Sequence, residues 1–190
     1  DKNSLLKAGG AKAGDILVLT KRLCTGIITS AVKKGKVKQA YLNEAIDSML
    51  LLNKTASKAA VSAGARAATD VTGFGLLGHA LNMAKGSKID LIIYNDKIPL
   101  MSKVKDLAAT GAVPKGARNN LEYCSRSTTF SENISDGDKL ILSDPQTSGG
   151  LLIALPPEGI KKFDRTMKRA KHPYWIIGEV VKGRGGIIVE

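Results

Sequence analysis

The sequence predicts an α+β fold in which a mixed β-sheet is flanked by α-helices. Short apolar runs typical of strands and longer segments with helical periodicity are both present, but they do not alternate strictly along the chain. Strict alternation would favour a doubly wound parallel sheet. The 190 residues suit one domain, and a hydrophobic fraction of 43% with only 4% aromatic residues predicts an aliphatic core.

The N-terminal half is predicted to contain three strands and three helices. The strands are the short apolar runs at residues 15–20, 66–71 and 88–94. The helices, marked by apolar residues at helical spacing, are expected at residues 26–34, 41–63 and 73–85. Gly64 is a suitable stop signal for the longest of them.

The C-terminal half starts with a predicted helix at residues 102–110. Residues 111–138 are rich in Gly, Asn, Ser and Thr with little periodicity, so we interpret them as a functional or mobile loop. Two strands, 139–143 and 151–155, are expected on either side of a polar segment. A helix starting at Pro156 and Pro157 and two closing strands complete the prediction, at residues 157–170, 174–181 and 186–189.

The formal net charge of +12 favours anionic partners, but it does not choose among them. Cys24 and Cys124, the only two cysteines, lie far apart, so no disulfide framework or zinc site is indicated. No apolar run approaches the ~20 residues of a membrane span, and the first residues lack the apolar stretch of a signal peptide. We therefore expect a cytoplasmic protein without a membrane partner.

A strand, a glycine-containing turn and a helix are predicted in succession over residues 68–80, ATDVTGFGLLGHA. Asp70 would end the strand, and Thr72, Gly73 and Gly75 would form the turn. A helix N-terminus presents free N–H groups, and glycines let an anion approach the backbone. A carboxylate at the strand's end can hold Mg²⁺, which prefers oxygen ligands and often bridges to phosphate. The alternative is that Asp70 or Thr72 only caps the helix.

Residues 143–151, SDPQTSGGL, form a second polar segment. Pro145 keeps Asp144 out of the helical region, and Gly149 and Gly150 would permit backbone angles closed to other residues. The hydroxyl groups of the Thr-Ser pair could donate to an anion. The alternative is a plain hairpin loop, for which this length and these glycines are normal.

Residues 20–26, TKRLCTG, follow the first predicted strand and precede a helix. Lys21 and Arg22, together with Thr25 and Gly26, could contact a phosphate. The alternative is an ordinary capped helix start beside surface charge.

Taken in order, these segments resemble the selenophosphate synthetases. The matching stretches are GAKAGDILVLTKRLCTGI, ATDVTGFGLLGHALNMA, SDPQTSGGLLIAL and IIGEVV, which together span Gly10 to Val181. TDVTGFG and DPQTSGG are specific to that family. TDVTGFG also has looser counterparts in the superfamily of aminoimidazole ribonucleotide synthetase and thiamine monophosphate kinase. The resemblance implies a fold similar to the C-terminal domain of that superfamily.

The resemblance implies an enzyme that converts ATP, selenide and water to selenophosphate, AMP and orthophosphate and that requires Mg²⁺. In the family, an N-terminal ATP-binding domain carries the reactive cysteine or selenocysteine, a catalytic lysine and metal-binding aspartates. Residues 1–190 correspond to a single C-terminal domain without it, so we expect no catalytic residue here and no activity of this chain alone. The implied partners are ATP, selenide, the N-terminal domain and a second copy of the full-length protein.

The family pattern carries over with a definite role at one position, Asp70, which would complete a Mg²⁺ site shared with the missing domain. Other matching residues are expected near the active-site cleft without an assigned role: Thr72, Gly73, Gly75, Asp144, Gln146, Thr147, Ser148, Gly149 and Gly150. Thr25 and Gly26 are possible phosphate contacts.

The sequence departs from the family pattern at two positions. Cys24 stands where the family usually has glycine in Leu-Gly-Thr-Gly, and Ala13 stands where proline is usual. The change at Cys24 puts a backbone role of that position in doubt. Cys24 is not the catalytic residue of the family, because that residue belongs to the missing domain.

Two other classes of protein compete with this interpretation. A stand-alone interaction or regulatory domain could have kept the fold and lost catalysis. A basic nucleic-acid-binding module would explain the charge but not the two motifs, and few aromatic residues are available for stacking on bases. We therefore expect no nucleic acid as a specific partner, and only weak, salt-sensitive binding of anions without sequence preference.

Overall fold

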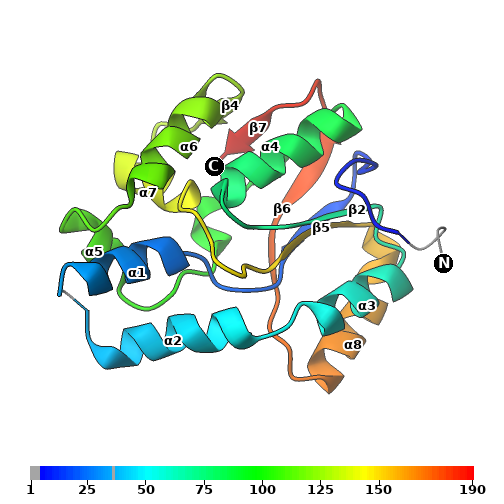
Figure 1. Ribbon diagram of the computed structural model, residues 1–190. Coiled ribbons are helices and arrows are strands. Elements are labelled where there is room, and N and C mark those ends of the chain that lie inside the picture. Colours follow the sequence, from blue (N-terminus) through cyan, green and yellow to red (C-terminus); the bar gives the residue numbers. More distant parts are fainter. Residues whose placement is uncertain (1–4, 36) are drawn as a thin grey trace.

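In a computed structural model, which describes residues 5–35 and 37–190, seven strands form one mixed sheet (Figure 1). The strands are β1 (Ile16–Leu19), β2 (Ala67–Asp70), β3 (Ile89–Ile93), β4 (Thr128–Phe130), β5 (Leu151–Leu155), β6 (Trp175–Lys182) and β7 (Ile187–Val189). Their order is β2-β5-β1-β6-β3-β7-β4. Pairing is antiparallel from β2 to β3 and parallel from β3 through β7 to β4. The prediction of an α+β fold with a mixed sheet is confirmed.

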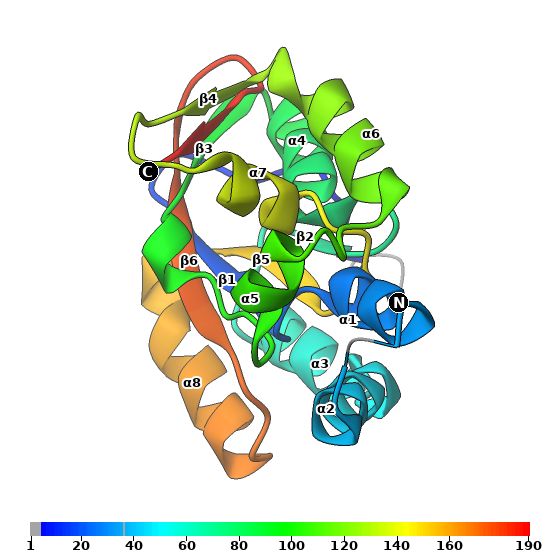
Figure 2. The ribbon, with the colours of Figure 1, turned by 90° about the vertical axis from the view of Figure 1, so that its left-hand side faces the viewer.

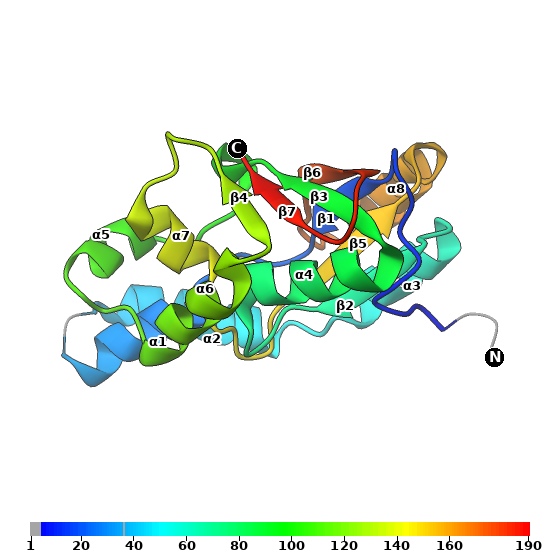
Figure 3. The same ribbon diagram turned by 90° about the horizontal axis from the view of Figure 1, so that it is seen from above.

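Helices cover both faces of this sheet. They are α1 (Thr25–Lys33), α2 (Gln39–Leu50), α3 (Lys54–Ser62), α4 (Gly75–Ser87), α5 (Val104–Ala109), α6 (Lys115–Ser125), α7 (Asp136–Leu142) and α8 (Ile160–Arg169), with the short 3₁₀ turns η2 (Asn95–Lys97) and η3 (Pro157–Gly159). Seen from above, α1, α5, α6 and α7 gather at one end and α3 and α8 at the other (Figure 3). Of the described helices, none has the length and apolar character to cross a membrane.

Alternating side chains of the central strands build two separate cores. Leu17 and Leu19 of β1 point into the larger core with α1 and α4, whereas Val18 points into the smaller core with α3 and α8. The neighbouring strand β5 alternates in the same register, because Val18 pairs with Ile153. Figure 2 shows α4 and α8 on opposite sides of these strands. As predicted, the buried side chains are mainly aliphatic, with Phe163 the largest exception.

The prediction of a single helix at residues 41–63 is wrong, because helix α2 ends at Leu50 and helix α3 begins at Lys54. The two helices have different packing partners: α2 contacts α1, whereas α3 contacts β5 and α8. Polar groups of the loop before β5 stabilise the break. Ser148 Oγ donates to the Met49 carbonyl at 2.8 Å, and Asn53 Nδ2 donates to the Gly149 carbonyl at 2.8 Å.

The loop predicted at residues 111–138 is also wrong, because it contains α6, β4 and the start of α7. Helix α6 is polar and buries only a narrow stripe, in which Ala117 and Cys124 are the fully buried members. The strand predicted at residues 139–143 belongs to helix α7. Ser135 caps that helix by accepting from the Asp138 N–H at 3.1 Å, and the short apolar run after it fits either structure.

Candidate active site

Three polar segments meet at one edge of the sheet, at the end where β1 and β2 finish and β5 begins (Figure 1). Asp70 at the end of β2 pairs with Leu151 at the start of β5. Backbone hydrogen bonds continue this contact beyond the strands, from Val71 N to the Gly150 carbonyl at 2.8 Å and from Gln146 N to the Thr72 carbonyl at 2.9 Å. The turn after β2 and the loop before β5 therefore lie together.

The third segment, residues 20–26, joins them through the N-terminus of α1. Asp144 Oδ2 accepts from Gly26 N at 3.0 Å and from Ile27 N at 3.2 Å. Gln146 Oε1 accepts from Cys24 N at 2.8 Å and from Thr25 N at 3.2 Å. Side chains of the loop thus satisfy the first N–H groups of α1. The possible phosphate contact at Thr25 and Gly26 stays a prediction, and both N–H groups already have protein acceptors.

Asp144 is fully buried, and this burial governs its electrostatics. Loss of solvation raises the pKa of Asp144 to about 7, although hydrogen bonds from Ile27, Gly26 and Gln146 act in the opposite direction. Its Oδ1 atom has no hydrogen-bond partner among the described residues. The buried carboxylate fixes the loop at α1. The alternative of a plain hairpin loop is wrong, because the segment connects helix α7 to strand β5 and not two strands.

Asp70 is exposed at the end of β2, beside a buried histidine on α4. His79 Nε2 accepts from Thr72 N at 3.1 Å, and Thr72 Oγ1 also lies 3.1 Å from it. Burial lowers the pKa of His79, and the nearby negative charge of Asp70 opposes this shift. His79, which sequence reasoning did not assign to the site, holds the turn against α4 and leaves the Asp70 carboxylate facing solvent.

The part of the chain that the structure describes can offer a metal ion only part of a coordination shell. Within the described residues, no group of three or more His, Cys, Asp or Glu side chains could hold a metal. An exposed carboxylate at a strand end still fits the oxygen-ligand preference of Mg²⁺. Asp70 is thus suited to contribute one ligand to a site completed by other groups.

The glycines of the site serve close packing more than unusual backbone angles. A Cβ on Gly149 would overlap the Val71 carbonyl oxygen, and a Cβ on Gly150 would lie 2.6 Å from the backbone nitrogen of Lys21. Neither glycine has a positive φ, so the predicted reason for this pair is wrong. Gly75 differs, because it combines a φ of 68° with close approach to the Ser143 carbonyl. Gly73 has open space around it.

Exposure divides the remaining loop residues into two groups. Gln146 is buried, whereas Thr147 and Ser148 face solvent on the same edge as Asp70. Lys21, almost completely buried, donates from Nζ to the Ser148 carbonyl at 2.7 Å, and burial lowers the pKa of this lysine. Lys21 therefore stabilises the loop from its buried side, through the Ser148 carbonyl.

Asn120 of α6 is a site residue that the sequence did not reveal. Its Nδ2 atom donates to the Gly73 carbonyl at 2.9 Å and to the Ser143 carbonyl at 3.0 Å. One amide group thus connects the turn after β2 with the loop before β5. An asparagine in a polar segment without periodicity carries no signal of this role.

Cys24 occupies a backbone conformation that favours glycine. Its φ is 91° and its ψ is 37°, in the left-handed region, and its side chain is fully buried. Burial, with the charge of Asp144, raises the pKa of its thiol well above the usual value. A protonated, inaccessible thiol agrees with the expectation that Cys24 is not a nucleophile.

The family model described as AIR synthase related protein, C-terminal domain, matches residues 12–190 of the chain. The chain belongs to this family. It is 37% identical over 187 residues to a selenide, water dikinase of Clostridium botulinum (strain Eklund 17B / Type B), covering 98% of the chain and 54% of that protein. It is 45% identical over 160 residues to a selenide, water dikinase of Geobacter metallireducens, covering 84% and 46%. The chain spans about half the length of the curated relatives it matches.

Solved structures share the fold of this chain at low sequence identity. A hydrogenase maturation protein HypE superposes with a TM-score of 0.70 and 16% identity, covering 97% of this chain and 52% of that one. Thiamine-monophosphate kinase from Stenotrophomonas maltophilia K279a superposes with a TM-score of 0.65 and 18% identity, covering 100% and 54%. These likenesses support the fold, and the resemblance of the motifs to the selenophosphate synthetases agrees with the more similar relatives.

Proposed function

We propose that this chain forms the C-terminal half of a selenide, water dikinase, which makes selenophosphate from selenide, ATP and water and releases AMP and orthophosphate. The observation that carries the proposal is the meeting of the two specific motifs, TDVTGFG and DPQTSGG, at one edge of the sheet. Similarity to selenide, water dikinases over nearly the whole chain supports it. A stand-alone regulatory or nucleic-acid-binding module would require neither the motifs nor their contact.

In this proposal Asp70 supplies one oxygen ligand of Mg²⁺, and Mg²⁺ would neutralise charge on the ATP phosphates. The exposed side of the turn and the loop, including Thr72, Thr147 and Ser148, lines the cleft that an N-terminal ATP-binding domain closes. Asp144 and Gln146 act as positioning residues, because their side chains hold the loop at the start of α1. Asn120 is a third, because its amide group joins the turn to the start of the loop. Assembly of the protein as a homodimer and its cytoplasmic location stay predictions.

The test is selenide-dependent formation of AMP by the full-length protein that carries this chain. With ATP, Mg²⁺ and selenide, we expect AMP and selenophosphate, detected by chromatography and ³¹P NMR. Residues 1–190 alone should form neither product, because the nucleophile and the catalytic lysine expected for the reaction are not part of this chain. Full-length protein that consumes ATP equally well without selenide would contradict the proposal.

A further inference from the structure

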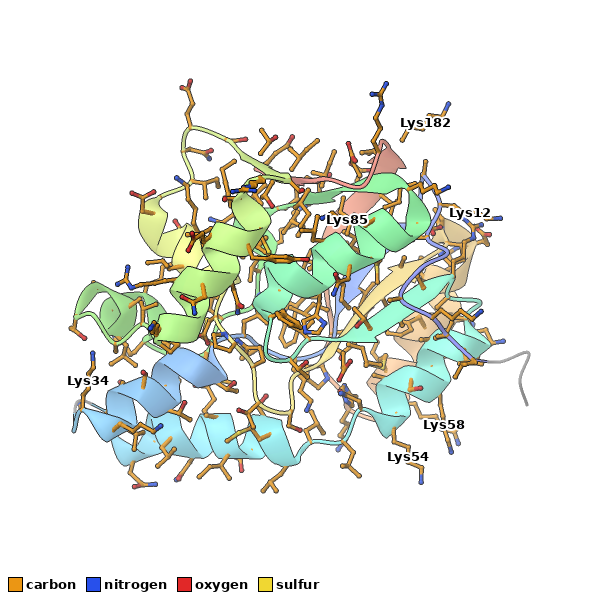
Figure 4. The ribbon with its side chains drawn as sticks, turned by 45° about the horizontal axis from the view of Figure 1, so that its top comes forward. Lys12, Lys34, Lys54, Lys58, Lys85 and Lys182 are labelled. Carbon is orange, nitrogen blue, oxygen red and sulfur yellow. The ribbon has the colours of Figure 1, made fainter. Side chains whose placement is uncertain are left out.

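The outward face of α3 and α8 carries a concentration of positive charge that the proposed function does not use. Both helices bury their apolar sides in the smaller core, so their other sides point away from the sheet. We define the α3–α8 basic face by its exposed cationic residues: Lys54, Lys58, Lys161, Lys162, Arg165, Lys168, Arg169 and Lys171. In Figure 4, Lys54 and Lys58 extend from α3 into solvent.

Few of these charges are neutralised within the protein. Lys168 pairs with Asp164 at 3.0 Å, and the other nearby carboxylate, Glu158, lies 3.6 Å from Arg66. In residues 5–35 and 37–190, no other member of the basic face makes an ion pair. Lys168 and Arg169 lie in the last turn of α8, where positive charge interacts favourably with the helix dipole. The helix dipole does not account for the cations at the start and centre of the helix, Lys161, Lys162 and Arg165.

The chemistry of the face distinguishes among its possible partners. A protein partner usually requires an apolar centre and few lysines, whereas Val61 is the one large apolar side chain that α3 and α8 expose among the described residues. Stable anchoring at a membrane surface adds inserted apolar residues to electrostatic attraction, but Phe163 and Met167 of α8 are buried in the core. A sugar-phosphate backbone requires only spaced cations.

We propose that the α3–α8 basic face binds the phosphate backbone of a nucleic acid without reading its sequence. Lys161, Arg165 and Arg169 follow one another at intervals of four residues, so they form a stripe about 12 Å long. The sequence argument against nucleic acid concerned base recognition, which requires aromatic or base-reading side chains, and backbone binding requires neither. This inference is independent of the proposed catalytic function.

The test compares two variants with the same change of charge. The first is Lys161→Glu/Arg165→Glu/Arg169→Glu, on the basic face. The control is Lys33→Glu/Lys97→Glu/Lys115→Glu, in which three exposed lysines on separate elements are reversed. Each protein is titrated with a fluorescent 30-nucleotide poly-U RNA between 50 and 200 mM salt, and melting temperatures verify folding. A Gln version of the first triple replaces it if charge reversal prevents folding.

We expect the face variant to weaken RNA binding at least about tenfold at 50 mM salt and to reduce the slope of log K against log salt by about 2. The control should lose less than about threefold. Equal losses in the two variants would overturn the proposal, as would the absence of binding by the unmodified protein. Poly-glutamate that displaces the RNA at equal charge concentration would instead assign the face to an acidic protein partner, and would equally overturn it.

Discussion

The carboxylate of Asp144 accepts a hydrogen bond from the backbone N–H of Gly26, 118 residues away in sequence, at 3.0 Å. This bond joins the loop before β5 to the first turn of α1. Gly26 permits it, because a Cβ there would lie 2.6 Å from Asp144 Oδ1. The contact explains why Asp144 and Gly26 are both needed to hold the loop against α1. Neither residue needs to touch a substrate for this role.

The buried Asp144 should make stability depend on pH. Its folded-state pKa of about 7 lies above the ordinary value of 3.8, so its contribution to stability is complete below pH ~4 and is lost as pH rises through 7. Asp144→Asn cannot ionise and should remove this loss. Urea unfolding at pH 5, 6, 7 and 8 should give a free energy of unfolding that falls more steeply for the unmodified protein than for the variant. Parallel curves would show that Asp144 is not protonated on folding.

The glycines of the two motifs should differ in their tolerance of alanine. Gly149→Ala forces a Cβ into the Val71 carbonyl oxygen, and we expect a loss of at least about 2 kcal/mol. Gly73→Ala is the control, because open space surrounds it and its φ is not positive; its stability should change by less than about 1 kcal/mol. Urea unfolding measures both. Equal effects would refute the close-packing explanation of Gly149.

Cys24 provides a test of backbone strain. Cys24→Gly removes the strain of a left-handed backbone conformation but also removes a buried side chain. We therefore expect the free energy of unfolding to change by no more than about 1 kcal/mol. Cys24→Val places a β-branched side chain at a φ of 91° and should cost more than about 2 kcal/mol. Thermal unfolding of the two variants should rank them in this order, and a Val variant as stable as the Gly variant would disprove the strain.

Asn120 and its neighbour Asn119 form a matched pair on α6. Asn120→Ala removes two hydrogen bonds between the motif segments and should cost about 1–3 kcal/mol, whereas exposed Asn119→Ala should change stability by less than about 0.5 kcal/mol. In the full-length protein, Asn120→Ala should also lower kcat, since the two segments lose one of the connections between them and keep only their backbone hydrogen bonds. A variant that is destabilised but has normal kcat would restrict Asn120 to a structural role.

Much of the fold was predictable because the central strands and α4 carry strong patterns. The runs at β1, β3 and β5 are apolar, short and bounded by turn residues, and the structure confirms them. Prediction failed where tertiary contacts decide. Helix α6 is mostly polar, and its stripe of buried and partly buried residues, Ala117, Leu121 and Cys124, follows helical spacing but contains too few apolar residues to stand out in the sequence. The break before α3 depends on hydrogen bonds of Ser148 and Asn53 to residues that lie 99 and 96 positions away in the sequence.

The candidate site was predictable in its segments but not in its internal bonds. The types of residues at 68–80 and 143–151 indicated turns at strand ends, and the structure brings them together. The roles of Gln146 and Lys21 depend on hydrogen bonds to residues 122 and 127 positions away, which no spacing in the sequence reveals. His79 bonds to Thr72, seven positions before it, and a single histidine on a predicted helix gives no sign of that contact. Asp70 lies exposed at the end of β2, and its metal role stays a prediction.

The most direct test of the central claim is the turnover of full-length Asp70→Asn, measured as selenide-dependent AMP formation across a Mg²⁺ titration. Asp70 is exposed and does not cap α4, whose N-cap is Phe74, so the melting temperature should stay nearly unchanged. We predict that turnover falls by about a hundredfold or more, with only partial recovery at high Mg²⁺, because one oxygen ligand has lost its charge. Near-normal turnover of the variant, at the Mg²⁺ concentration that serves the unmodified protein, would remove Asp70 from the metal site and contradict the account.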